Sequence, residues 1–151
     1  MPKNFRPVSN LPFVSKLIEK LGLDQLFHHL DHNNLWHTFQ SAYHPKHSTE
    51  TALLHVLNDL LIASGAGCIS ILTLLDQSVA VNTIDHSILL THLESTFGIL
   101  DLALCFLRSY LQDRTQVVTV NEIKSSPSLL TCGVPQGSVL GPVLFILYAH
   151  N

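Results

Sequence analysis

The sequence has little charge, and the charge that it has is not basic. Only 13% of its 151 residues are charged, and eight lysines and arginines against eleven aspartates and glutamates give a net charge of -3 at pH 7. Proteins that bind nucleic acid strongly usually carry a basic excess, because neutralising phosphates supplies much of their affinity. Any nucleic-acid binding by this chain would therefore need a local patch or residues beyond these 151.

Cysteine is also scarce. The three cysteines are far apart and form no Cys-x-x-Cys pair, which disfavours both a disulfide scaffold and a zinc knuckle. We expect a reducing compartment, and so an intracellular protein of the cytoplasm or nucleus. His28 and His32 would share a helix face, but no further ligands follow at the spacing of a zinc finger.

Long apolar runs are missing too. The longest uninterrupted one, near the C-terminus, is much shorter than the roughly 20 residues of a membrane span. The first residues contain no apolar stretch of the kind found in signal peptides. We therefore expect neither a membrane protein nor a secreted one. With 46% hydrophobic residues, the chain is long enough for one domain with a real core.

Apolar spacing predicts helices in four places. These are residues 11–30, 48–64, 84–97 and 101–111. Gly22 is expected to divide the first stretch into two short helices. The second opens at Ser48 and ends in the glycine-containing run 64–67, and Asn82 or Thr83 is the expected cap of the third.

Two further regions have strand patterns. Residues 68–75 are short, β-branched and almost wholly apolar, which is typical of a central strand covered on both faces. Residues 114–120 alternate like a half-buried strand, and residues 128–132 are its expected partner. Helices mixed with a sheet make the fold class α/β or α+β.

Asp76 is the first candidate for chemistry. It follows the predicted buried strand, at a sheet edge where open α/β sheets tend to place ligands. A carboxylate there is costly to bury unless it is paired or coordinates a metal. The alternative is an ordinary turn or capping aspartate.

The second candidate is the loop of residues 133–142, which has three glycines and two prolines. Gly137 allows a backbone to approach a ligand closely, and the amide of Gln136 can both donate and accept hydrogen bonds. Pro142 suits the first turn of the apolar helix that follows. The alternative is an ordinary strand–loop–helix connection.

Taken together and in order, these segments resemble the reverse transcriptase domain of non-LTR retrotransposons. The matching stretches are NFRPVSNLP at 4–12 with KLIEK at 16–20, FQS at 39–41 with HSTETAL at 47–53, LLD at 74–76 with DHSILL at 85–90, RSYLQDRTQ at 108–116, and GVPQGSVLGPVLFILY at 133–148. The resemblance implies part of a right-hand polymerase fold. Residues 1–67 would be fingers-like, and residues 68–151 would form an incomplete palm.

The resemblance also implies an activity and a site. The family's activity is RNA-directed DNA polymerisation, with an RNA template, a DNA primer, deoxynucleotides and two Mg²⁺ ions. Asp76 falls on the first metal-binding, catalytic carboxylate, an oxygen ligand of the kind that Mg²⁺ prefers. Gln136 and Gly137 fall on the loop that packs against the incoming nucleotide.

Some positions depart from the family's pattern. Val81 stands where the family usually has a bulky aromatic residue that blocks the ribose 2′-hydroxyl, and Asn82 stands where aspartate is common. His44 replaces an arginine that helps to handle the triphosphate, so a permanent cation becomes a pH-dependent one. Lys46 is expected to compensate in part.

The family's second carboxylate motif, a hairpin with two adjacent aspartates, is not among these 151 residues. Asp85 is expected to support the first turn of its helix instead of replacing that pair. We therefore expect a truncated reverse transcriptase domain that is inactive alone. One alternative is a part of a longer active polymerase. Another is a non-catalytic module that binds RNA weakly, or binds a protein at an exposed palm edge.

Overall fold

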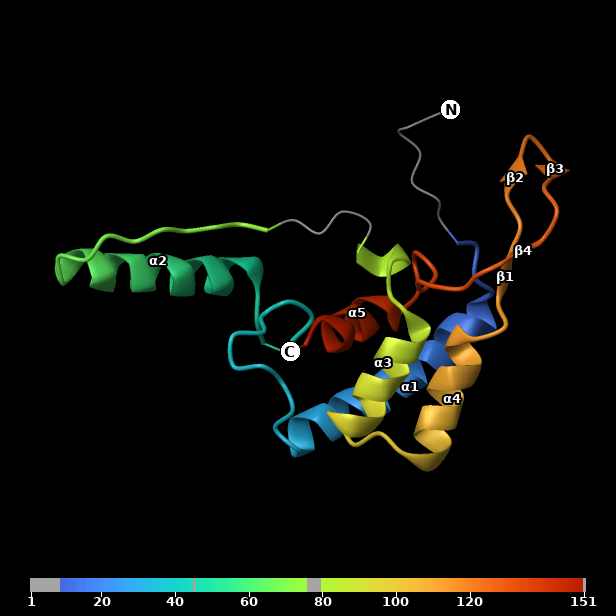
Figure 1. Cartoon of the computed structure of the whole chain (residues 1–151), viewed down its shortest axis with the longest axis horizontal. Helices are drawn as coiled ribbons and strands as arrows, with labels where there is room; N and C mark the ends of the chain where they lie inside the picture. Colours follow the sequence, from blue (N-terminus) through green and yellow to red (C-terminus); the bar gives the residue numbers. More distant parts are fainter. Residues whose placement is uncertain (1–8, 45, 76–79, 151) are drawn as a thin grey trace. The chain divides into compact units, whose positions relative to one another are not determined.

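The computed structural model describes residues 9–44, 46–75 and 80–150 (Figure 1). The chain divides into two compact units. The first is built from residues 1–35 and 79–151, and the second from residues 36–78. The second unit is therefore an insertion in the sequence of the first.

The first helix, α1, runs without interruption over Phe13–His32. The prediction that Gly22 divides it was wrong, and the reason lies in another helix. A Cβ atom built at Gly22 would lie 3.1 Å from Cε1 of Phe106, a residue of helix α4 (Asp101–Leu111). Glycine therefore leaves room for the ring of Phe106 beside α1, and this tertiary packing outweighs its poor helix propensity of about 1 kcal/mol.

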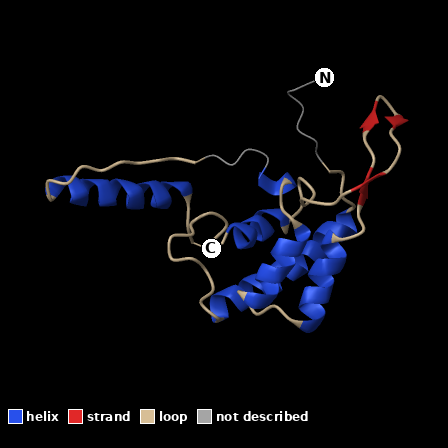
Figure 2. Cartoon of the chain, viewed as in Figure 1, coloured by secondary structure: helices blue, strands red, loops and turns tan. Residues whose placement is uncertain are grey.

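Helices α3 (His86–Ser95), α4 and α5 (Gly141–Ala149) complete the core of the first unit (Figures 1 and 2). Helix α3 contacts both α4 and α5, and α5 also contacts the short 3₁₀ turn η1 (Ala80–Asn82). The buried apolar side chains come from all four α-helices and include Leu26, Leu30, Leu89, Leu93, Leu104, Leu107, Leu144 and Leu147. The amphipathic spacing of 101–111 predicted α4 correctly.

Helix α3 begins later than predicted, and its cap is a different residue. The carboxylate of Asp85 accepts hydrogen bonds from the backbone N–H groups of Ser87 (2.8 Å) and Ile88 (3.1 Å). Asn82, one of the two expected caps, belongs to η1. The expectation that Asp85 supports the first turn of its helix is confirmed.

Two short antiparallel pairs form the strands of the first unit (Figure 2). Strand β1 (Thr115–Gln116) pairs with β4 (Ser128–Leu129), as predicted, with Thr115 opposite Leu129. Between them, β2 (Thr119–Val120) pairs with β3 (Ile123–Lys124). All of these residues are exposed, so the expected half-buried strand was wrong in its burial.

The second unit contains helix α2 (Thr49–Gly65), which starts and ends as predicted. Ser48 caps it: the Ser48 hydroxyl accepts from the N–H of Thr51, and the Thr51 hydroxyl accepts from the N–H of Ser48. This reciprocal arrangement is a capping box, here with threonine at the third position. No residue of α2 is buried, although its sequence has an apolar stripe.

The predicted central strand over residues 68–75 is wrong. This segment is neither helix nor strand, and Ile69 and Leu75 are 94% and 93% exposed. The segment does not form a strand because it has no pairing partner: among the residues that the structure describes, no strand forms a ladder with it. An apolar run becomes a buried strand only when partners supply hydrogen bonds and cover its faces.

Helices and small sheets together confirm the mixed α and β class. Within the described parts of the chain, no helix combines the length and apolar character needed to cross a membrane.

Candidate functional site

Two of the predicted motifs meet in the first unit through their backbones. The N–H of Gly133 donates to the carbonyl of Ile84 at 2.7 Å, and the N–H of Val134 donates to the carbonyl of Val81 at 2.9 Å. An isolated antiparallel bridge joins Asp85 to Cys132. Val81 therefore lies directly beside the start of the loop that carries Gln136.

Gly133 is the residue that permits this approach. Its φ of +79° is in the left-handed region, and a Cβ atom there would lie 2.8 Å from both the Cα and the carbonyl oxygen of Asn82. No side chain fits at that distance. The buried ring of His86 contacts the same residue, with Nε2 2.7 Å from the carbonyl oxygen of Gly133.

A cavity of about 290 Å³ opens beside this contact. It is lined by Ser9, Asn82, Gln116, Leu130, Cys132, Gly133, Val134, Pro135 and Gln136. Three of these residues carry amide side chains, which can donate and accept hydrogen bonds at the same time. The lining contains no charged residue, so the cavity is suited to a neutral polar group.

The rest of the loop is held by hydrogen bonds on both sides of Gly137, whose φ is +90°. The N–H of Ser9 donates to the carbonyl of Gln136 at 3.1 Å. The hydroxyl of Ser138 accepts from the N–H of Gly141 at 2.7 Å, at the start of α5. Pro142 lies in the first turn of α5, as predicted.

A buried carboxylate from α1 also contacts the loop. Oε2 of Glu19 accepts from the N–H of Val139 at 2.6 Å and from that of Leu140 at 3.5 Å. The hydroxyl of Ser15 donates to Oε1 at 3.3 Å, and Glu19 is only 1% exposed. Sequence reasoning did not single out this residue, although it lies in the stretch KLIEK, because a glutamate in a helix is usually a surface residue.

The remaining predicted residues belong to other segments of the chain. Asp76, the candidate for the catalytic and metal-binding carboxylate, lies outside the described residues. His44 and Lys46 belong to the second unit. There, Nδ1 of His44 lies 2.8 Å from Nδ1 of His47, and the His44 ring packs edge-on against Trp36.

Within the described ranges, no three histidine, cysteine, aspartate or glutamate side chains gather in a way that could hold a metal ion. The sequence prediction of a metal ligand rests on Asp76 alone, so the structure does not test it. The same is true of the roles of Val81, Gln136, Gly137, His44 and Lys46, whose positions are described but whose ligands are not.

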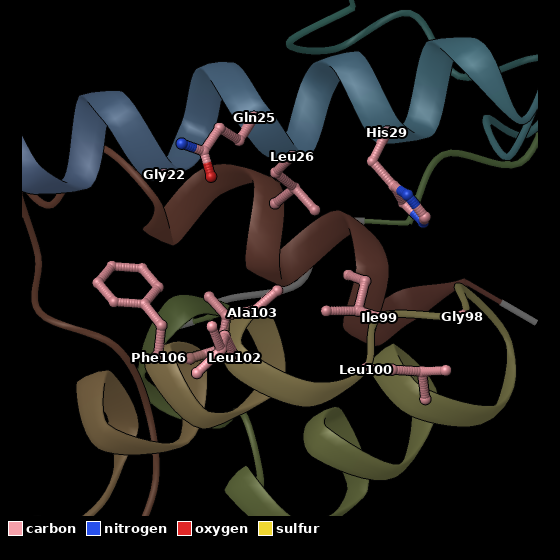
Figure 3. A pocket seen from close by; sticks show the side chains of 11 residues that line it. Gly22, Gln25, Leu26, His29, Gly98, Ile99, Leu100, Leu102, Ala103 and Phe106 are labelled. Carbon is pink, nitrogen blue, oxygen red and sulfur yellow. The ribbon is translucent and has the colours of Figure 1, made fainter.

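A second cavity, of about 540 Å³, lies between α1 and α4 (Figure 3). Its lining is mostly apolar, with Leu26 of α1 facing Leu102 and Phe106 of α4. His29 is one of its few polar residues, and its Nε2 lies 2.7 Å from the carbonyl of Phe97. None of the predicted site residues that the structure describes lines this cavity.

Comparison with known proteins identifies the class to which this fold and loop belong. The family model described as reverse transcriptase (RNA-dependent DNA polymerase) matches residues 1–151. The chain therefore belongs to the reverse transcriptase family. Reverse transcriptases in general depend on a divalent metal ion and bind an RNA template, a primer and nucleotides.

Within this family, the relatives of the chain are polymerases of mobile elements. It is 33% identical to the RNA-directed DNA polymerase from mobile element jockey of Drosophila melanogaster, over 98% of the chain and 16% of that protein. It is 32% identical to the probable RNA-directed DNA polymerase from transposon X-element of the same fly, over 99% of the chain and 16% of that protein. The resemblance to non-LTR retrotransposons is confirmed.

The chain thus corresponds to a segment of the reverse transcriptase domain and spans 16% of the length of these relatives. No solved structure matches it significantly.

Proposed function

We propose that this chain supplies part of the nucleotide site of an RNA-directed DNA polymerase. The observation that supports the proposal best is the backbone pairing of Val81 with Val134. It joins two motifs that are far apart in the sequence, and it does so at the rim of a cavity with three amide side chains. In this proposal, Val81, Gln136 and Gly137 face the incoming nucleotide.

The chemistry of the cavity fits the neutral parts of a nucleotide. Bases and sugars present hydrogen-bond donors and acceptors, and the amides of Asn82, Gln116 and Gln136 can form hydrogen bonds with both. The charged triphosphate needs other partners, because the cavity lining contains no cation. We assign that role to His44 and Lys46, and we assign metal binding to Asp76, whose carboxylate is a hard oxygen ligand.

The side chain of Val81 bears on the choice of sugar. Valine is smaller than the aromatic residue usual in the family, so it leaves more room beside the ribose 2′ position. We therefore expect ribonucleotides and deoxynucleotides to bind here with similar affinity, since little steric penalty distinguishes them.

We propose the same two parts of the polymerase fold that the sequence predicts. Residues 1–67 would be the fingers-like part and residues 68–151 the palm part. A two-ion mechanism needs more than one carboxylate. The 151-residue polypeptide should therefore not extend a primer by itself, whereas a longer chain that supplies the remaining carboxylates should. Incorporation by the 151 residues alone that Asp76→Asn abolishes would contradict this part of the proposal.

The direct test is nucleotide binding observed residue by residue. The ¹⁵N-labelled chain would be titrated with a deoxynucleoside triphosphate and Mg²⁺, in the presence of an RNA–DNA template–primer. We expect amide shifts to change at residues 81–82, 133–134 and 136–137. The same titration with a ribonucleotide should move the same signals. Changes confined to other parts of the chain, or no change at all, would overturn the proposal.

A second candidate function is protein binding along residues 68–75. The observation that favours it is that the apolar side chains of this segment are exposed, and that among the described residues no strand pairs with it. An extended partner segment could add a strand to it. Sedimentation velocity over a range of concentrations would reveal self-association, the simplest case. Ile71→Lys should abolish it, while Leu102→Lys, at an exposed position of α4, should not.

A further inference from the structure

The position of Glu19 is unusual for a carboxylate. It lies in the middle of α1 and is almost fully buried, with 1% of its surface exposed. A buried carboxylate is costly unless hydrogen-bond donors compensate for the water that it loses. Its donors are the backbone N–H groups of Val139 and Leu140 and the hydroxyl of Ser15.

These N–H groups lie immediately before helix α5, which begins at Gly141. The first N–H groups of a helix have no partners within the helix, and the helix dipole favours a negative charge there. The carboxylate of Glu19 therefore lies at the N-terminal end of α5, where a negative charge is favourable, although it comes from a different helix. Ser138, whose hydroxyl accepts from the N–H of Gly141, contributes a further acceptor there from within the loop.

The loop segment that carries Gln136 and Gly137 is fixed by hydrogen bonds on both sides. Upstream, Gly133 and Val134 are bonded to the carbonyls of the 81–84 segment. Downstream, Val139 is bonded to Glu19. Gly137 has a left-handed backbone conformation, and glycine is the most flexible residue. The position of Gln136 and Gly137 therefore depends on the hydrogen bonds on both sides of them.

We propose that Glu19 is a positioning residue: by holding the backbone of Val139 and Leu140, its carboxylate sets the conformation of Gln136 and Gly137. This inference rests on the proposed function, in which these two residues face the nucleotide. Glu19 does not touch the nucleotide itself. Its contribution is to keep the loop in the one conformation that presents Gln136 to the cavity.

The first experiment compares amide hydrogen exchange in three forms of the chain. Glu19→Gln preserves the size of the side chain, but it removes the charge and places an N–H₂ group where one carboxylate oxygen stood. The matched control is Glu94→Gln, at an exposed position of α3. In Glu19→Gln we expect exchange at Val139 and Leu140 to be about tenfold faster or more, because a charge-assisted hydrogen bond is lost. Amides in the core of α4 should be unchanged.

A role confined to overall stability would give a different result. In that case, exchange would rise equally throughout the first unit and the midpoint of urea unfolding would fall, with no separate effect on residues 136–141. That outcome would overturn the proposal. Glu19→Asp serves as the conservative variant, and it should restore part of the protection because it restores the charge. If it gave no more protection than Glu19→Gln, the charge would not be responsible.

The second experiment separates this inference from the proposed function. The nucleotide titration is repeated with Glu19→Gln, and we expect the changes at Gln136 and Gly137 to be weakened while those at Val81 persist. If the unsubstituted chain shows no nucleotide response, the proposed function fails, yet the exchange result for Glu19 still decides whether it holds the loop. If nucleotide shifts at Gln136 and Gly137 are the same in both proteins, Glu19 is not a positioning residue.

Discussion

Nε2 of His86 lies 2.7 Å from the carbonyl oxygen of Gly133, and this contact joins the first residue of α3 to the start of the 133–142 loop. Because the partner is a carbonyl, Nε2 carries the hydrogen. The same glycine donates its own N–H to Ile84. Gly133 is thus bonded in both directions to the segment that leads into α3.

Replacing His86 with phenylalanine should destabilise the chain. The ring shape is roughly kept, but the carbonyl of Gly133 loses its donor, at a cost of about 1–3 kcal/mol. The midpoint of urea unfolding, followed by circular dichroism, measures this loss. His55→Phe, at an exposed position of α2, is the control and should leave the midpoint nearly unchanged. Equal midpoints for His86→Phe and the unsubstituted chain would show that the contact contributes nothing.

Gly133→Ala should be more harmful than the same change at another left-handed glycine. Both Gly133 and Gly98 have positive φ, so alanine costs about 1–2 kcal/mol at either position. At Gly133 the new Cβ would also meet the backbone of Asn82 at 2.8 Å, whereas at Gly98 it would meet nothing within 4 Å. We expect Gly133→Ala to lower the free energy of unfolding clearly further than Gly98→Ala. Similar losses of unfolding free energy in a denaturant titration would contradict the close approach of Gly133 to Asn82.

The cap at Asp85 predicts a response to acid. The hydroxyl of Ser87 and the N–H groups of Ile88 and Ser87 hold the pKa of this carboxyl below its ordinary value of 3.8. A lowered folded pKa means that the stabilisation is present above the unfolded pKa and is lost as the pH falls through the folded one. Asp85→Asn keeps a capping side chain without the titration. Between about pH 5 and pH 2, the variant should therefore lose less stability than the unsubstituted chain, as measured by thermal unfolding. Parallel losses would show that Asp85 is not a source of the acid sensitivity.

Tyr110 predicts the opposite response, in alkali. Burial, together with the nearby charge of Glu19, raises the pKa of its hydroxyl above the ordinary value of 10.0. The stabilisation is then fully present below the unfolded pKa and is lost as the pH rises through the folded one. Tyr110→Phe should remove this alkaline loss. At neutral pH it should change stability by no more than about 1 kcal/mol, because within the described residues the buried hydroxyl lies near Ser138 and Arg114 but makes no hydrogen bond of ordinary geometry. A large loss at neutral pH would reveal a partner for the hydroxyl.

Features that depend on neighbouring residues were predictable from the sequence. The amphipathic spacing of 101–111 gives α4 because one face packs on the core, and Ser48 begins α2 because its hydroxyl accepts from the helix start. The pairing of β1 with β4 followed from alternation and an intervening turn. Pro142 was placed correctly because its missing N–H costs nothing in a first turn.

Features that depend on distant residues were not predictable. Gly22 reads as a break until Phe106 is seen packed against it. Residues 68–75 were predicted to be a buried strand because an apolar segment is usually covered by other elements. The composition of the segment does not show whether such elements are present. In the candidate site, the resemblance assigned Val81 and the loop of Gln136 to the same nucleotide. The burial of Glu19 could not be predicted, because its partners are backbone groups far away in the sequence.

The separation between Glu19 and Val139 also bears on how the protein is made. These residues are 120 positions apart in the chain. At a typical rate of about 5–20 residues per second, a ribosome needs roughly ten seconds to travel from one to the other. During that time α1 has left the ribosome with its carboxylate in water, and the insertion of residues 36–78 has been synthesised. The loop of residues 133–142 can therefore reach its final conformation only after the ribosome has passed it, when α1 has already been in solution for seconds.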